Sequence, residues 1–64
     1  MEAEEMIGMI IEALYVYDEE SEEDIINTIN TYESEGLLTN DKGIVVRLKD
    51  QKSVFHITVT ERES

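Results

Sequence analysis

A short run of carboxylates is the part of this sequence whose residue types and spacing most suggest a chemical site. Six of the seven residues from Asp18 to Asp24 are acidic, and such a run raises the question of calcium. An EF-hand loop needs a glycine at its sixth position and a bidentate glutamate at its twelfth. Counted from Asp18, these positions hold Glu23 and Ile29. The pattern therefore predicts a solvent-exposed connection that a partner can reach, and no calcium site.

Groups suited to catalysis or to a cofactor are few. The chain has no cysteine, which removes thiol nucleophiles, thiolate metal ligands and disulfides. His56 is the one histidine, and we expect it on the solvent-facing side of a strand. Glutamate pairs perform acid–base chemistry only where burial or crowding separates their pKa values, and the pattern gives no sign of enclosure. We therefore predict a non-enzymatic protein with no catalytic residue, no metal site and no cofactor.

The charge of the chain is large and unevenly distributed. The formal net charge is −11 over 64 residues. Residues 1–41 carry thirteen acids and neither lysine nor arginine, whereas residues 42–64 carry five bases and three acids. Such a field repels nucleic acid and anionic membranes, and it accelerates association with basic surfaces. We therefore expect a basic partner, and no direct contact with nucleic acid or with a membrane.

Two helices are predicted in the acidic half. Apolar residues at helical spacing, from Met6 to Tyr17, indicate a first helix over residues 2–17. Ser21 has the residue type of an N-cap, with Asp24 at the capping-box position, and it would begin a second helix over residues 22–35. Gly36 suits the position after a helix, where a positive φ is favoured. This second helix would direct the following residues inward: Ile25, Ile26, Ile29 and Tyr32.

The basic half is predicted to be β-structure. We expect a short strand over residues 37–39, strands over residues 44–49 and 53–60, and a frayed tail over residues 61–64. Pairing Leu48 with Phe55 would set Val46 against Ile57, so that the inward face of the hairpin is apolar throughout. The same register sets Ile44 against Val59.

These elements define the expected fold class, which is α+β. Residues 1–64 would form a single small domain in which two N-terminal helices pack on a C-terminal antiparallel hairpin or three-stranded meander, in the order α-α-β-β. A chain of this size buries only about 60% of its unfolded surface, and no disulfide stabilises it, so we expect a dimer or larger assembly. The first helix has more apolar residues than its expected neighbours can cover. The predicted self-association residues are Met6, Met9, Ile10 and Leu14.

The expected compartment follows from what the first residues lack. Three of the first five residues are acidic where a secretory signal needs positive charge, and the longest apolar runs fall far short of the roughly 20 residues that span a bilayer. We therefore expect a cytoplasmic protein, in the host cytoplasm if the chain is phage-encoded.

Two hypotheses for function follow. In the first, the acidic half is a decoy that occupies a basic, nucleic-acid-binding groove on another protein. In size and charge the chain resembles small phage-encoded inhibitors, including anti-CRISPR proteins and DNA mimics, and this resemblance implies an inhibitor. The predicted partner-binding residues are Asp18, Glu19, Glu20, Glu22, Glu23 and Asp24, with Glu33 and Glu35 as secondary contacts. In the alternative, the chain is a small homo-oligomeric accessory or structural subunit whose acidity only maintains solubility.

Overall fold

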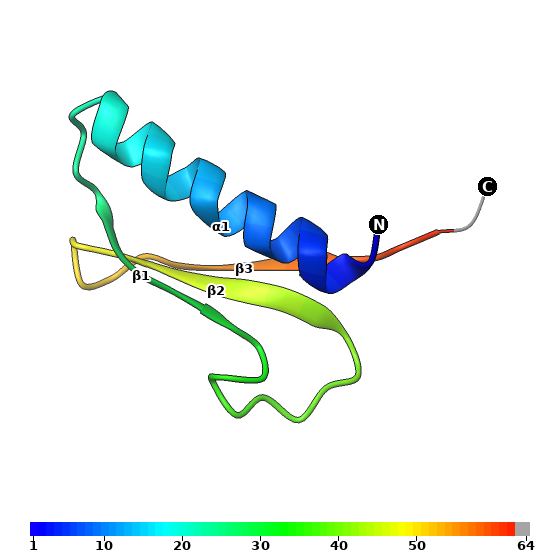
Figure 1. Cartoon of the computed structure of the whole chain (residues 1–64). Coiled ribbons are helices and arrows are strands. Elements are labelled where there is room, and N and C mark those ends of the chain that lie inside the picture. The colour runs from blue at the N-terminus through cyan, green and yellow to red at the C-terminus, as the bar shows by residue number, and fades with distance from the viewer. Residues whose placement is uncertain (63–64) are drawn as a thin grey trace.

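One helix lies across one face of a three-stranded antiparallel sheet in the computed structural model, which describes residues 1–62 (Figure 1). The elements are α1 (Ala3–Glu20), β1 (Ile26–Thr31), β2 (Lys42–Leu48) and β3 (Val54–Val59), and the strand order is β1-β2-β3. The predicted α+β class is confirmed. The prediction of two N-terminal helices is wrong, because the described residues contain only one.

Strand β1 replaces the expected second helix over residues 22–35. Its sequence repeats Ile-Asn-Thr, and the β-branched isoleucine and threonine favour extended structure, whereas asparagine is a poor helix former. Strand β2 is covered on both faces, because Ile44, Val45 and Val46 are consecutive and all buried. The expected N-cap, Ser21, ends α1 instead, as its C-cap.

A β-bulge explains why β1 has a helical pattern in its sequence. Ile26 pairs with Leu48 and Thr28 with Arg47, so Asn27 is an extra residue in β1. In a regular strand, residues three apart face opposite sides, but a bulge resets the alternation. Ile26 and Ile29 therefore both contact the helix side of the sheet. Their i, i+3 spacing results from the bulge and not from a helix.

The turn after β1 matches one local prediction and contradicts another. The N–H of Gly36 donates to the carbonyl of Glu33, and the N–H of Leu37 donates to the carbonyl of Tyr32. These two bonds form a Schellman motif, and Gly36 takes the expected positive φ, at 73°. Residues 37–39 form no strand, so that prediction is wrong. The predicted tail, residues 61–64, lies partly outside the described residues.

The predicted hairpin is present, but its register differs by two residues. Val46 pairs with Phe55 and Ile44 with Ile57, where we expected Ile57 and Val59. The loop chemistry accounts for the difference. The Asp50 carboxylate accepts hydrogen bonds from the Lys52 and Ser53 backbones and from the Ser53 hydroxyl. These bonds close a loop that ends where the N–H of Leu48 donates to the carbonyl of Ser53.

Helix α1 crosses the sheet diagonally. At its start, Glu4 pairs with Lys42 of β2, and the N–H of Ala3 donates to Glu61, just beyond β3. At its end, Asp18 bonds the beginning of β1, and Figure 1 shows the same diagonal. The core between the two layers contains Ile7, Ile29, Ile44 and Val46, with partly buried Ile10, Ile11, Leu14, Ile26, Leu48 and Val59. A diagonal helix leaves two opposite corners of the sheet uncovered.

Tyr32 is the central contact on the far face of the sheet, the face opposite α1. Its hydroxyl is 2.8 Å from the hydroxyl of Thr58, and its ring lies 5.8 Å from that of His56. To reach these β3 residues the tyrosine crosses β2 at Gly43, where a Cβ would overlap the Tyr32 ring and the Ile57 carbonyl. Glycine is therefore required at position 43 for lack of space.

Two glycine substitutions test this packing with opposite signs. Gly43→Ala should destabilise the protein by about 1–3 kcal/mol, because the added methyl must displace the Tyr32 ring or the β3 backbone. Gly8→Ala should stabilise it by about 0.5–1 kcal/mol, because Gly8 lies inside α1 with open space around it. Urea unfolding followed by circular dichroism measures both. Equal effects of the two substitutions would show that Tyr32 does not cross the sheet at Gly43.

Candidate functional site

The predicted partner-binding run begins with a residue that faces inward. Asp18 is buried, and its carboxylate accepts hydrogen bonds from the N–H groups of Ile25 (2.9 Å) and Ile26 (3.3 Å). A buried carboxylate that receives two backbone donors joins the end of α1 to the start of β1. The structure therefore gives Asp18 a positioning role beneath the exposed acids that follow it.

The following four glutamates form an exposed acidic turn at the end of α1, which we define as Glu19, Glu20, Glu22 and Glu23. The last turn of the helix contains no basic residue, and among residues 1–62 no lysine, arginine or histidine pairs with these four carboxylates. The C-terminal end of a helix carries partial negative charge, so carboxylates there are destabilising. The acidic turn thus concentrates negative charge where the helix itself disfavours it.

The backbone of this turn is also strained. Glu22 and Asp24 have φ values of 59° and 51°, in the left-handed region that costs non-glycine residues about 1 kcal/mol or more. Glycine would fit both positions at lower cost. Charge and conformation therefore both disfavour Glu22, whose exposed side chain takes no part in the core.

The remaining predicted contacts are distributed elsewhere. Asp24 lies next to the acidic turn and pairs with Lys49 at 2.6 Å, through two exposed side chains. Glu35 lies on the far face of the sheet, where both of its oxygens bind Arg47, at 2.6 and 2.9 Å. Glu33 is exposed in the loop after β1 and lines a different pocket. The structure therefore groups Glu19 to Asp24 and separates them from Glu33 and Glu35.

The Glu35–Arg47 pair shifts both groups toward their charged forms. The Arg47 guanidinium, by hydrogen bonding and by its charge, lowers the pKa of Glu35, and a hydrogen bond from Asn30 acts in the same direction. Glu35 in turn raises the pKa of Arg47. This arrangement is an internal ion pair that fastens the turn after β1 onto the sheet, and it leaves Glu35 little capacity for a partner.

Charge density distinguishes the acidic turn from the back of the helix. Glu5, Glu12 and Glu19 recur every seven residues, which at 1.5 Å per residue places them about 10 Å apart along α1. Phosphates in one strand of DNA follow one another about every 3.4 Å of helix axis. The row along the helix is therefore about three times too sparse to imitate a phosphate backbone. The acidic turn, with four carboxylates in five residues, has the higher local density.

A shallow hollow opens beside the acidic turn. Tyr15, Asp18, Glu19, Glu22, Asp24 and Ile26 line it. Tyr15 is held in place by its hydroxyl, which accepts a hydrogen bond from the N–H of Ile29. Carboxylates beside an aromatic ring are the groups that bind the cationic head of a lysine or arginine side chain. The hollow is therefore suited to a basic side chain of a partner.

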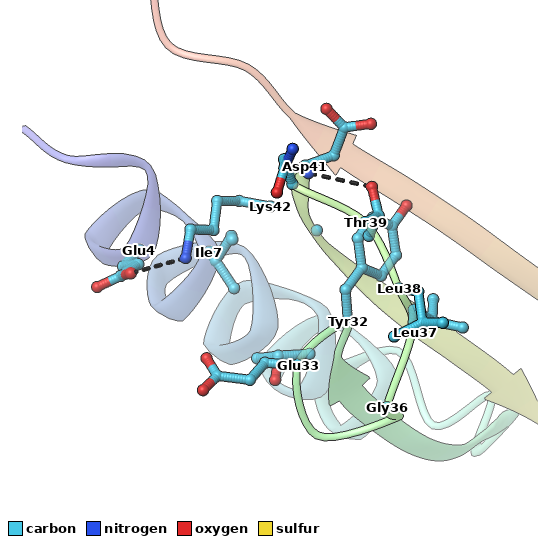
Figure 2. A pocket seen from close by; sticks show the side chains of 13 residues that line it. Glu4, Ile7, Tyr32, Glu33, Gly36, Leu37, Leu38, Thr39, Asp41 and Lys42 are labelled. Carbon is cyan, nitrogen blue, oxygen red and sulfur yellow. Dashed lines mark hydrogen bonds and ion pairs between the residues drawn. The ribbon is translucent and has the colours of Figure 1, made fainter.

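A second pocket, of about 540 Å³, lies at the corner of the sheet beyond the start of α1. Figure 2 shows it between Ile7 of the helix and the loop after β1, with Tyr32 on its wall and the Glu4–Lys42 pair beside it. Leu38 in this loop is fully exposed and Leu37 is 39% exposed. The exposure of these two leucines was not predictable from their residue type, which is typical of a buried strand position.

Within residues 1–62 no three His, Asp or Glu side chains come together as ligands for a metal ion. Every buried side-chain nitrogen or oxygen in that range has a hydrogen-bond partner. No helix there combines the length and the apolar character that crossing a membrane requires. The described residues thus present charged and apolar surfaces, and no enclosed polar site.

Comparisons of the chain with protein-family models, with curated proteins and with solved structures find no match.

Neutralising the acidic turn should stabilise the protein. Replacing Glu19, Glu20, Glu22 and Glu23 by glutamine removes four charges from the negative end of the helix, and we expect Tm to rise by at least about 4 °C at low salt. Added salt should raise the Tm of the original protein and reduce the difference. Differential scanning calorimetry at two salt concentrations measures both effects. A lower Tm would mean that these glutamates hold the fold together.

The Glu35–Arg47 pair should contribute to acid sensitivity. Because the pKa of Glu35 is lowered in the folded state, its contribution is present above the ordinary carboxyl pKa and is lost as the pH falls through the lowered value. Glu35→Gln should therefore be less stable than the original at neutral pH, and it should lose less stability between about pH 5 and pH 2. Urea unfolding across this range measures the difference. Glu33→Gln is the control, and an equal effect there would contradict the assignment.

Proposed function

We propose that this chain is a non-enzymatic acidic protein that binds a basic surface of another macromolecule. Its action would be that of an inhibitor or DNA-mimicking decoy, of the phage-encoded anti-CRISPR type, which competes with nucleic acid for a nucleic-acid-binding protein in the cytoplasm. The acidic turn would be the main contact. Asp24 and Glu33 would add charge at longer range, and Asp18 would hold the turn in place.

The observation that carries this proposal is the concentration of unpaired carboxylates in the acidic turn, at the end of α1 where a helix disfavours negative charge. Four exposed glutamates stand at the negative end of α1, without an ion pair from the described residues. Glu22 and Asp24 also adopt positive φ. Strained backbone positions cluster at sites of binding and catalysis. A surface that serves only solubility has no need to concentrate its charge at this one position.

The hollow beside the turn indicates how a partner would bind. A lysine or arginine side chain of the partner would enter between Tyr15 and the carboxylates of Glu19 and Glu22. Further basic residues would meet Glu20 and Glu23. An interface of this kind gains most of its association rate and much of its specificity from charge, so its affinity falls as salt rises.

Affinity chromatography on the immobilised protein tests the proposal. Nuclease-treated cell extract is applied, bound basic proteins are eluted with salt, and each is then tested for displacement of labelled duplex DNA by the protein. We expect a DNA-binding protein whose DNA is displaced, with Kd rising by about tenfold or more between 50 and 300 mM salt. The four-glutamine variant of the acidic turn should raise Kd by a similar factor.

A charge-matched variant provides the control. Replacing Glu2, Glu5, Glu12 and Asp41 by their amides removes four charges elsewhere, so both variants have a net charge of −7 (−11 plus 4). The control should retain most of the affinity. If both variants lose affinity equally, binding depends on total charge and the acidic turn is not the site. If neither variant displaces less DNA than the original, the substituted carboxylates do not carry the binding; if the original itself displaces no DNA, the decoy function is wrong.

A further inference from the structure

The outer edge of β3 is open. The N–H of Leu48 donates to the carbonyl of Ser53, so in the β2–β3 ladder the backbone groups of Phe55 and Ile57 point toward β2. Those of Val54, His56 and Thr58 must point away from the sheet. Within the described residues no backbone group outside β2 pairs with them. The strand has neither proline, bulge nor lysine, the devices that usually protect an edge.

The other edge of the sheet is protected. Strand β1 contains the bulge at Asn27. The outward N–H of Ile29 donates to the Tyr15 hydroxyl, and the N–H groups of Ile25 and Ile26 donate to Asp18. Side chains of helix α1 therefore cap three N–H groups at or beside β1, and of the two sheet edges in the described residues β3 is the more open.

The apolar corner beside β3 lacks a cover. Because α1 crosses diagonally, Val59 packs under the start of the helix, whereas Ile57 is 36% exposed and Phe55 54% exposed on the same face. Tyr17 lies on the flank of α1 opposite Tyr15, which contacts β1, and it is also exposed. Met6 and Met9 are exposed nearer the helix start. Apolar side chains thus surround a strand edge with unpaired backbone groups.

We propose that a second copy of this chain covers this corner by antiparallel pairing of β3 with β3. In the register that pairs His56 with His56 of the second copy, Val54 pairs with Thr58 and the outward backbone groups all bond. Phe55 then faces Ile57 of the second copy on the helix side. The product is a six-stranded sheet with two-fold symmetry and both helices on one face.

The geometry of the two-fold axis supplies the missing cover. The second copy runs antiparallel, so the start of its helix, which lies above its own Val59, comes next to the uncovered Phe55 of the first. Met6 of each copy, which lies on the same flank of α1 as Tyr17, would then approach Phe55 and Tyr17 of the other. Met6 and Met9, predicted from the sequence to mediate self-association, are the two exposed members of that set, whereas Ile10 and Leu14 pack partly against the core.

Charge selects a second copy as the occupant. In a two-fold contact each patch meets the same patch on the second copy. A protein with a net charge of −11 therefore associates with itself most readily through a surface that is free of carboxylates. Residues 54–60 contain no acidic and no basic residue apart from His56. A basic partner would gain nothing from this strand, because it would find no carboxylate there.

Sedimentation equilibrium over about 1–500 µM tests the proposal. The original protein should dimerise. Phe55→Lys should raise the dimer Kd by about tenfold or more, because the lysine of each copy would lie beside Ile57 of the other. Leu38→Lys is the control, since it makes the same change at a fully exposed loop residue, and it should dimerise like the original. Circular dichroism establishes whether Phe55→Lys is folded; if it is not, Met6→Lys takes its place.

Two further readouts test the register. Amide hydrogen exchange of His56 and Thr58 should slow by about tenfold or more in the concentration range of dimerisation. The chain has no cysteine, so His56→Cys should form a disulfide-linked dimer under mild oxidation, whereas Leu38→Cys should do so much more slowly. Equal cross-linking of the two variants, or a dimer whose His56 and Thr58 amides exchange as in the monomer, would overturn the pairing.

Salt separates this proposal from the proposed function. Two chains of like charge repel, so added salt should strengthen the dimer, whereas it should weaken binding to a basic partner. A monomer at 500 µM in both low and high salt would overturn the dimer and leave the decoy function standing. If the protein dimerises but no basic partner is recovered, the decoy function is overturned and the dimer stands.

Discussion

The packing of one helix across three strands is the constraint on which the rest of this structure depends. Strand β2 supplies the centre, with Ile44 and Val45 almost fully buried on opposite faces. A single helix cannot cover a twisted sheet completely, so α1 joins one end of β3 to the opposite end of β1. The two corners that it leaves become the pocket beside the loop after β1 and the apolar corner on β3.

The same geometry fixes where the charge lies. Asp18 anchors the end of α1 to β1, so the next four glutamates are held at the outer tip of the molecule. Bases from the β-hairpin neutralise three carboxylates elsewhere: Glu4, Asp24 and Glu35. The acidic turn lies beyond these pairs. Its negative field is therefore local, and it is supported by a buried carboxylate that is itself part of the fold.

Local patterns predicted the elements that depend on neighbours in sequence. The first helix, two of the strands and the positive φ of Gly36 follow from spacing and residue type. Strand β1 was predicted to be a second helix, because its bulge gives it the i, i+3 spacing of a helix. The hairpin register was wrong by two, because a shift of two residues keeps every side chain on its face and only the Asp50 loop distinguishes the alternatives.

In the candidate site too, some features depend on local sequence and others on contacts made in the fold. The position of the acidic run was predictable, since it depends on composition alone. The inward direction of Asp18, the Glu35–Arg47 pair and the exposure of Leu38 were not, because each depends on contacts between residues distant in sequence. Sequence reasoning therefore located the charge, and the fold determined which carboxylates remain available.

The most direct test of the central claim is a chemical-shift titration of the labelled protein with a short lysine- and arginine-rich peptide at low salt. The account predicts that the largest shifts of backbone amides fall on residues 19–24 and on Tyr15, and that they diminish together as salt is added. Shifts spread evenly over all acidic residues, or centred on Glu4, Glu33 and Asp41, would contradict it.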